Sequence, residues 1–122
     1  MRQTTTKSVE IMAQNLLIDL GTSPSLLGFY YVIRAITLIY ENPEYRHQIT
    51  KKLYPEVAKL ENSTSRRVER AIRHAIDTTW SRGGIETLTS MFGGVVPKGV
   101  KPTNSEFISV LSLRIEQSLS EV

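Results

Sequence analysis

An amphipathic segment at residues 63–82 constrains the fold of this chain more than any other part of the sequence. Its apolar side chains recur every three or four residues, which is the spacing of one stripe along a helix. The stripe consists of Val68, Ala71, Ile72, Ala75, Ile76 and Thr79. At about 100° per residue, the opposite side consists of Arg66, Arg70, Arg73 and Asp77, flanked by Glu69 and His74. The segment, called the arginine helix below, therefore predicts a helix with one buried side and one basic side.

The dominance of arginine on the polar side points to a polyanionic partner. A plain solvated surface helix is the alternative interpretation, although such helices usually mix lysine with glutamate. The planar guanidinium group of arginine matches phosphate oxygens and the O6/N7 edge of guanine. Residues 51–82 contain eight Lys and Arg residues and four Asp and Glu residues. The rest of the chain contains seven basic and eight acidic residues. The positive charge is therefore concentrated around the arginine helix, as expected for a protein that binds nucleic acid.

Length and composition restrict the class of protein. A chain of 122 residues, 40% of them apolar, suits a single domain with one core, here assigned to residues 1–122. The absence of cysteine excludes disulfides, a Cys-ligated zinc and a cysteine nucleophile, and it agrees with a reducing cytoplasm. No apolar run reaches the roughly 18–20 residues that cross a bilayer, and polar residues interrupt the N-terminal pattern where a signal peptide needs an apolar core. We therefore expect a cytoplasmic protein without membrane contacts.

Start and stop signals divide the first third of the chain into two helices. We expect one helix at about 8–20, ended by Gly21. Its core-facing residues are predicted to be Val9, Met12, Ala13, Leu16 and Leu20. Ser23-Pro24 predicts the start of a second helix at about 24–41, which is apolar over most of its circumference and should lie at the centre of the core. The aromatic run at 29–31 suits core packing better than stacking with nucleic-acid bases.

The rest of the chain also shows helical signals only. Further helices are expected at 51–60, at 85–92 and after Thr103, with a loop at 93–102. Asn42-Pro43 starts a short helical turn, and Pro55 makes the 51–60 helix either restart or bend. Thr103 and Glu106 have the spacing of a capping box. Because no useful segment alternates with period two and no internal repeat is present, the sequence predicts an all-α domain.

The arginine helix and the helix before it have the pattern of a helix-turn-helix at about 51–82. Ala58 is small enough to allow a close crossing of the two helices. Asn62 follows four residues later and tolerates the left-handed backbone that such turns often need. Val68 then supplies the apolar contact between the helices. On this interpretation residues 65–82 form the recognition helix, which enters the major groove of DNA.

Several strings of residues resemble a known family. They are VERAIRHAI at 68–76, WSRG at 80–83 and KPTNSEFI at 101–108, with shorter matches at 49–51, 53–55, 58–59 and 90–93. Their order and spacing, over about residues 15–115, are similar to those of the DNA-binding effector domain of stage zero sporulation protein A, the sporulation response regulator of endospore-forming Firmicutes. The resemblance implies a six-helix domain that regulates transcription and reads a short box of double-stranded DNA through its fourth helix.

The resemblance also implies which residues touch DNA. The base-reading positions of the family fall on Arg67, Glu69 and Arg70, where arginine can grip guanine and glutamate can accept a hydrogen bond from the N4 amine of cytosine. Contacts with the DNA backbone are expected from Ser65, Arg66, Arg73, His74, Lys51 and Arg82. An alternative for Glu69 is that it orients Arg66 or Arg73 along the helix. Trp80 is expected to pack under the arginine helix, with stacking on DNA as the alternative.

Three departures from the family qualify the expected partners. Arg66 stands where the family usually has a serine, which predicts an added phosphate contact or a shifted preference for the flanking sequence. The family's RNA polymerase sigma factor contact would fall near 85–101, but the loop at 94–101 differs in sequence, so the resemblance supports this contact less. No phosphate-accepting receiver domain precedes the domain, which fits an excised fragment or, as the helical pattern from Met1 onward favours, a stand-alone paralogue. The family also implies a tandem homodimer on DNA.

Two other classes of function compete with DNA binding. A protein-interaction module that modulates another regulator could use the same fold, but it would not need Arg67, Glu69, Arg70 and Arg73 together. An enzyme is disfavoured because the chain lacks cysteine and a glycine-rich phosphate loop before a helix. His47 and His74 do not have metal-ligand spacing, so we expect neither a metal nor another cofactor.

Overall fold

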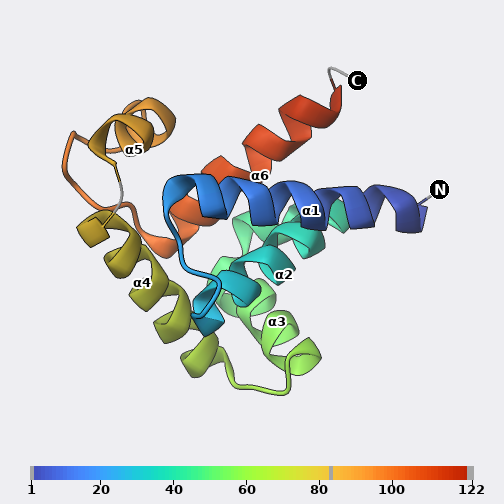
Figure 1. Cartoon of the computed structure of the whole chain (residues 1–122). Helices are drawn as coiled ribbons and strands as arrows, with labels where there is room; N and C mark the ends of the chain where they lie inside the picture. The colour runs from blue at the N-terminus through green and yellow to red at the C-terminus, as the bar shows by residue number, and fades with distance from the viewer. Residues whose placement is uncertain (1, 83, 121–122) are drawn as a thin grey trace.

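A computed structural model describes residues 2–82 and 84–120 (Figure 1). The helices are α1 (Arg2–Leu20), α2 (Leu27–Glu41), the 3-10 helix η1 (Pro43–His47), the π-helical turn η2 (Ile49–Leu53), α3 (Tyr54–Leu60), α4 (Ser65–Arg82), α5 (Ile85–Phe92) and α6 (Asn104–Ser120). These residues contain no strand. The prediction of an all-α fold with six α-helices is confirmed.

Helix α2 occupies the centre of the core. It packs against α1, α4 and α6, and α1 crosses over it in Figure 1. Nine of its fifteen residues are buried, because apolar side chains cover most of its circumference. Phe29 and Tyr31 are among them, so the packing interpretation of the aromatic run is confirmed for these two, whereas Tyr30 is exposed. The predicted central position of this helix is confirmed.

The first two helices differ from prediction at their starts. Helix α1 begins at Arg2 rather than near residue 8, since no glycine or proline interrupts the residues before it. Helix α2 begins at Leu27 rather than at 24. The reason is a local turn in which the Ser25 N–H donates to the Ser23 hydroxyl, and such side-chain bonds compete with helix formation. In α1 the fully buried leucines are Leu17 and the predicted Leu20, whereas the predicted Leu16 is only partly buried.

Pro43 and Pro55 each lie in the first turn of a helix. The Asn42 side chain accepts a hydrogen bond from the Glu44 N–H and Pro43 opens η1, which confirms the predicted short helical turn. At Pro55 the helix predicted at 51–60 changes its type instead of breaking, because Leu53 and Tyr54 both keep right-handed helical backbone angles. The chain makes one π-helical turn, η2, and α3 then begins with Pro55 in its first turn, where a missing N–H costs no helical hydrogen bond.

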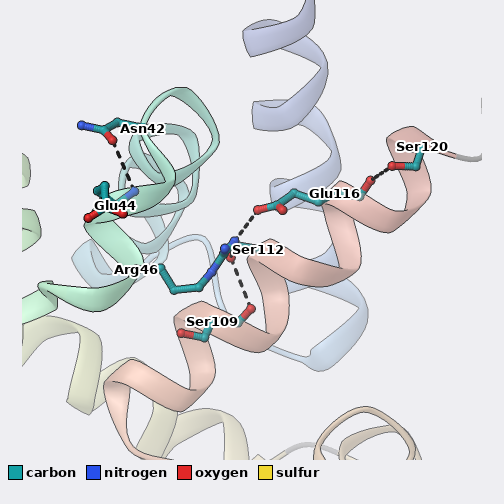
Figure 2. A network of polar contacts seen from close by, with 7 residues as sticks. All are labelled: Asn42, Glu44, Arg46, Ser109, Ser112, Glu116 and Ser120. Carbon is teal, nitrogen blue, oxygen red and sulfur yellow. Dashed lines mark hydrogen bonds and ion pairs between the residues drawn. The ribbon is translucent and has the colours of Figure 1, made fainter.

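A partly buried arginine ties the segment before α3 to the last helix. Figure 2 shows Arg46 of η1 reaching α6, where its guanidinium donates to the Ser112 hydroxyl at 3.0 Å and to the Glu116 carboxylate. The Arg46 side chain is 19% exposed, so this ion pair is partly shielded from water. The contact fixes the direction in which the chain enters the helix-turn-helix.

The start of α6 is a complete capping box. The Glu106 N–H donates to the Thr103 hydroxyl at 3.1 Å, and the Thr103 N–H donates to the Glu106 carboxylate at 2.8 Å. These reciprocal bonds satisfy two backbone donors at the helix terminus and confirm the predicted motif. They also hold the chain in place where it leaves the long connection between α5 and α6.

Replacing Thr103 by alanine is expected to lower the free energy of unfolding by about 1 kcal/mol, because the Glu106 N–H loses its acceptor. Urea denaturation should show a lower midpoint with an unchanged slope. Ser105→Ala is the matched control, since Ser105 is an exposed serine in the same helical turn. Equal unfolding free energies for the two variants would show that the cap contributes nothing.

Candidate nucleic-acid interface

Helices α3 and α4 form the predicted helix-turn-helix. The turn contains Asn62 with φ 52°, which confirms the left-handed backbone expected at this residue. Its neighbour Ser63 donates its N–H to the Ala58 carbonyl at 2.8 Å, and the Thr64 hydroxyl accepts from the Arg67 N–H at 3.2 Å. Local bonds therefore close α3 and cap α4, so the two helices meet at a defined angle.

The apolar stripe of the arginine helix is buried as predicted. The buried side chains are Val68, Ile72, Ala75, Ile76 and Thr79, whereas Ala71 is partly buried. Ala58 is also buried, and α3 and α4 pack closely. The core thus fixes the rotation of α4 about its axis, and this rotation decides which of its residues face outward.

A glycine allows α2 to approach α4 closely. A Cβ atom at Gly28 would overlap the Ala71 carbonyl and lie 2.8 Å from the Ala75 Cβ. Only glycine fits between these two helices, because any side chain there meets backbone atoms. Sequence reasoning missed Gly28, although a glycine near the start of a strongly apolar helix is a signal of such a crossing.

A buried hydroxyl pair provides a second link to α4. The Thr22 and Thr79 hydroxyl oxygens are 2.8 Å apart, and both residues are buried. Thr79 also donates to the Ala75 carbonyl at 2.7 Å, so Thr22 is the donor to Thr79. The connection between α1 and α2 is thereby joined to α4. Thr79 lies on the predicted apolar stripe, but its partner could not be read from the sequence.

Asn104 joins the start of α6 to both helices of the helix-turn-helix. Its side-chain amide donates to the Tyr54 hydroxyl at 3.1 Å and to the Glu69 carbonyl at 2.9 Å. Burial raises the pKa of the Tyr54 phenol. The phenol oxygen is the acceptor in this bond because the Asn104 amide nitrogen can only donate. Asn104 therefore holds the first half of α4 in place.

The polar side of α4 presents three arginines that have no carboxylate partner among the described residues. Arg66, Arg67 and Arg70 are exposed, and the ion pairs of the described chain do not include them. Arg73 instead pairs with Glu69 along the helix, at i and i+4. The predicted orienting contact of Glu69 is therefore confirmed for Arg73. The exposed side of α4 that carries Arg66, Arg67 and Arg70 is called the arginine surface below. The Glu69 side chain remains 29% exposed at the edge of this surface.

Four other residues predicted to contact the DNA backbone lie on α4 or in the turn before α3. His74 is exposed one turn beyond Arg70, Ser65 is half-buried at the start of α4, and Lys51 is exposed in η2 before α3. Arg82 is exposed at the far end of α4, about 18 Å along the axis from Arg70 and turned about 120° from it. Apart from Lys51 and Arg82, the predicted residues therefore lie between Ser65 and His74 on α4.

Trp80 belongs to an aromatic cluster with α5 and α6. Its ring centroid lies 5.2 Å from that of Phe92 and 6.0 Å from that of Phe107, and both contacts are edge-to-face. The two phenylalanine rings stack at 5.5 Å. The expectation that Trp80 packs is confirmed, although its partners are α5 and α6 to the side of α4.

None of the helices in the described part of the chain is both long and apolar enough to pass through a bilayer. None of its His, Asp and Glu side chains gather in threes as a metal site would require.

Comparison with known families agrees with this geometry. The model of the family described as "Sporulation initiation factor Spo0A C terminal" matches residues 13–115, which is most of the chain. The match spans α2 to α5 completely and therefore includes the helix-turn-helix, its arginine helix and the Thr103 cap. The chain belongs to this family, that of the DNA-binding effector domain of a sporulation transcription regulator.

Proposed function

We propose that this protein is a sequence-specific regulator of transcription that acts in the cytoplasm and inserts α4 into the major groove of double-stranded DNA. The observation that carries the proposal is the set of three exposed arginines on the first two turns of α4, none of which pairs with an acidic side chain of residues 2–82 or 84–120. A recognition helix contacts base edges mainly with its N-terminal residues. The positions of these arginines on the helix match that geometry.

Arg67, Glu69 and Arg70 are proposed to read bases. Arginine binds the O6 and N7 atoms of guanine with two hydrogen bonds, and a carboxylate accepts from the N4 amine of cytosine. The ion pair with Arg73 limits the rotamers of Glu69, so less conformational entropy is lost when Glu69 meets a base. A carboxylate has enough lone pairs to accept from both partners at once.

The contacts with phosphates are assigned to the residues around the base-reading set. They are Ser65, Arg66, Arg73, His74, Lys51 and Arg82. Lys51 precedes α3, the helix that crosses the DNA backbone in this motif. Arg66 and His74 flank Arg70 on the exposed side of α4, so they are placed to meet the phosphates on either side of the groove.

Two further partners complete the proposal. A tandem homodimer on repeated half-sites agrees with the usual behaviour of helix-turn-helix proteins. A sigma factor contact is assigned to α5 and the loop after it, near 85–101. Support for this contact comes from a cavity of about 220 Å³, whose lining includes Leu88, Phe92 and Val100, and from the exposure of Val95.

Replacing Arg70 by alanine is expected to weaken binding to a selected DNA site by about 1–3 kcal/mol and to relax the preference at one base pair, because a bidentate contact with guanine is lost. The measurement is a titration of Arg70→Ala against the selected duplex and against all single-base variants of it. The selected duplex comes from repeated selection with the parent protein from a random pool.

Arg114→Ala is the matched control, since Arg114 is an exposed arginine on α6, outside the helix-turn-helix. The control should bind all duplexes as the parent does. If Arg70→Ala keeps the base preference of the parent, Arg70 does not read a base. If the parent binds no duplex even at low salt, the protein-interaction alternative replaces the proposal.

A further inference from the structure

Asp77 places a negative charge on the outward side of the recognition helix. It follows Arg70 by seven residues, so at about 100° per residue it points within about 20° of the direction of Arg70. Its side chain is 48% exposed. A carboxylate in this position faces the same groove as the arginines, where the phosphate backbones of DNA would repel it.

Lys101 neutralises this carboxylate from outside the helix-turn-helix. Its ammonium lies 3.0 Å from the Asp77 carboxylate, and the Lys101 side chain is 53% exposed. Lys101 belongs to the connection between α5 and α6, and three residues later Asn104 donates to the Glu69 carbonyl. The segment 101–104 therefore runs beside α4 from Asp77 back to Glu69, held at both ends.

The neighbours of Lys101 make its position definite. Pro102 is buried, and Thr103 forms the capping box with Glu106. The backbone on the C-terminal side of Lys101 is therefore anchored, and the lysine side chain is directed toward α4 by the fold. An exposed ion pair contributes little to stability, so a functional consequence is to be sought in the charge of the DNA-facing surface.

We infer that Lys101 is a positioning residue for DNA binding, which cancels the charge of Asp77 on the recognition helix and extends the DNA-facing surface to the connection between α5 and α6. The inference rests on the proposed function. The Lys101–Asp77 ion pair has no net charge. Loss of the lysine leaves the negative charge of Asp77 on the surface, whereas loss of the aspartate charge leaves the positive charge of Lys101. The two changes should therefore affect DNA affinity in opposite directions.

The test compares Lys101→Ala with Asp77→Asn on one selected duplex over a range of salt concentrations. Lys101→Ala is expected to weaken binding about three- to tenfold, and Asp77→Asn to strengthen it by a similar factor. The freed lysine should also steepen the log–log salt dependence by up to about 0.9, the value for one added phosphate contact. The double variant should bind about as tightly as the parent.

A purely structural role of the pair makes a different prediction. If the pair only tethers the connection between α5 and α6, both substitutions break the tether and both weaken binding, and this result overturns the inference. Weaker binding by Lys101→Ala with no change in Asp77→Asn also overturns it, because Lys101 then contacts phosphate independently of Asp77.

Controls separate this inference from the proposed function. Lys98→Ala removes an exposed lysine of the same connection that has no ion pair in the described chain, and it should bind as the parent does. Thermal unfolding of each variant should match that of the parent. If the parent does not bind duplex DNA, the proposed function is contradicted. If the parent binds but Lys101→Ala and Asp77→Asn change the DNA affinity in the same direction and by the same factor, only the inference is contradicted.

Discussion

Replacing Gly28 by alanine is expected to destabilise the domain by about 3 kcal/mol, at the upper end of the usual cost of overpacking. The added methyl group would overlap the Ala71 carbonyl and press on the Ala75 side chain, so α2 and α4 must move apart. Alanine favours helix by up to about 1 kcal/mol over glycine, and this gain is smaller than the cost of the displacement. Urea denaturation measures the difference.

The same substitution should also weaken DNA binding at temperatures where the variant is folded, because α4 shifts relative to α3. Gly94→Ala is the matched control, since a Cβ atom at Gly94 has no neighbour within 4 Å. The control should keep the stability and the DNA affinity of the parent. A Gly28→Ala protein as stable as the control would show that the two helices do not need glycine at their crossing.

Replacing Phe107 by alanine is expected to cost about 3–5 kcal/mol of unfolding free energy. The Phe107 side chain is fully buried, stacks on Phe92 and meets the edge of Trp80. Its removal leaves a cavity where α4, α5 and α6 meet, and it also loses the aromatic contacts. A cost of this size is a large part of the roughly 5–15 kcal/mol that stabilises a typical domain.

Trp80 is the single tryptophan of the chain, so its fluorescence reports directly on this cluster. Phe107→Ala should change the emission of the folded protein and lower the denaturation midpoint. Leu113→Ala is the control on the same helix, because Leu113 is 46% exposed and its truncation removes little buried surface. Equal losses of stability in the two variants would contradict the contribution of the buried Phe107 ring to the packing of α4, α5 and α6.

The helices most accurately predicted are those whose ends are set by local chemistry. Residues 65–82 and 85–92 agree with α4 and α5, and the start of α6 follows from the Thr103 cap. These signals act within a few residues, so the sequence displays them directly. The predicted start of α2 at residue 24 was wrong, because two local signals compete at 23–25. One is a proline preceded by a serine, which favours a helix start, and the other is a serine turn, which opposes it.

In the candidate site, too, some features follow from local sequence spacing and others do not. The arginine surface follows from helical spacing, and the pair of Glu69 with Arg73 follows from their separation of four residues. The assignment of Arg67, Glu69 and Arg70 to bases came from the resemblance to a family, because spacing alone does not distinguish a base contact from a phosphate contact. That assignment stays a prediction for the Arg70→Ala experiment.

The sequence by itself determined that this chain is all-helical, where its arginine helix begins and ends, and that one side of that helix is basic. Only the tertiary structure decided what lies against the helix: Gly28 at the crossing with α2, Asn104 at Glu69, and Lys101 at Asp77. These partners are more than twenty residues away from α4's contacting residues along the chain. Helical periodicity specifies the direction of a side chain on its own helix, but packing alone decides which distant residue meets it.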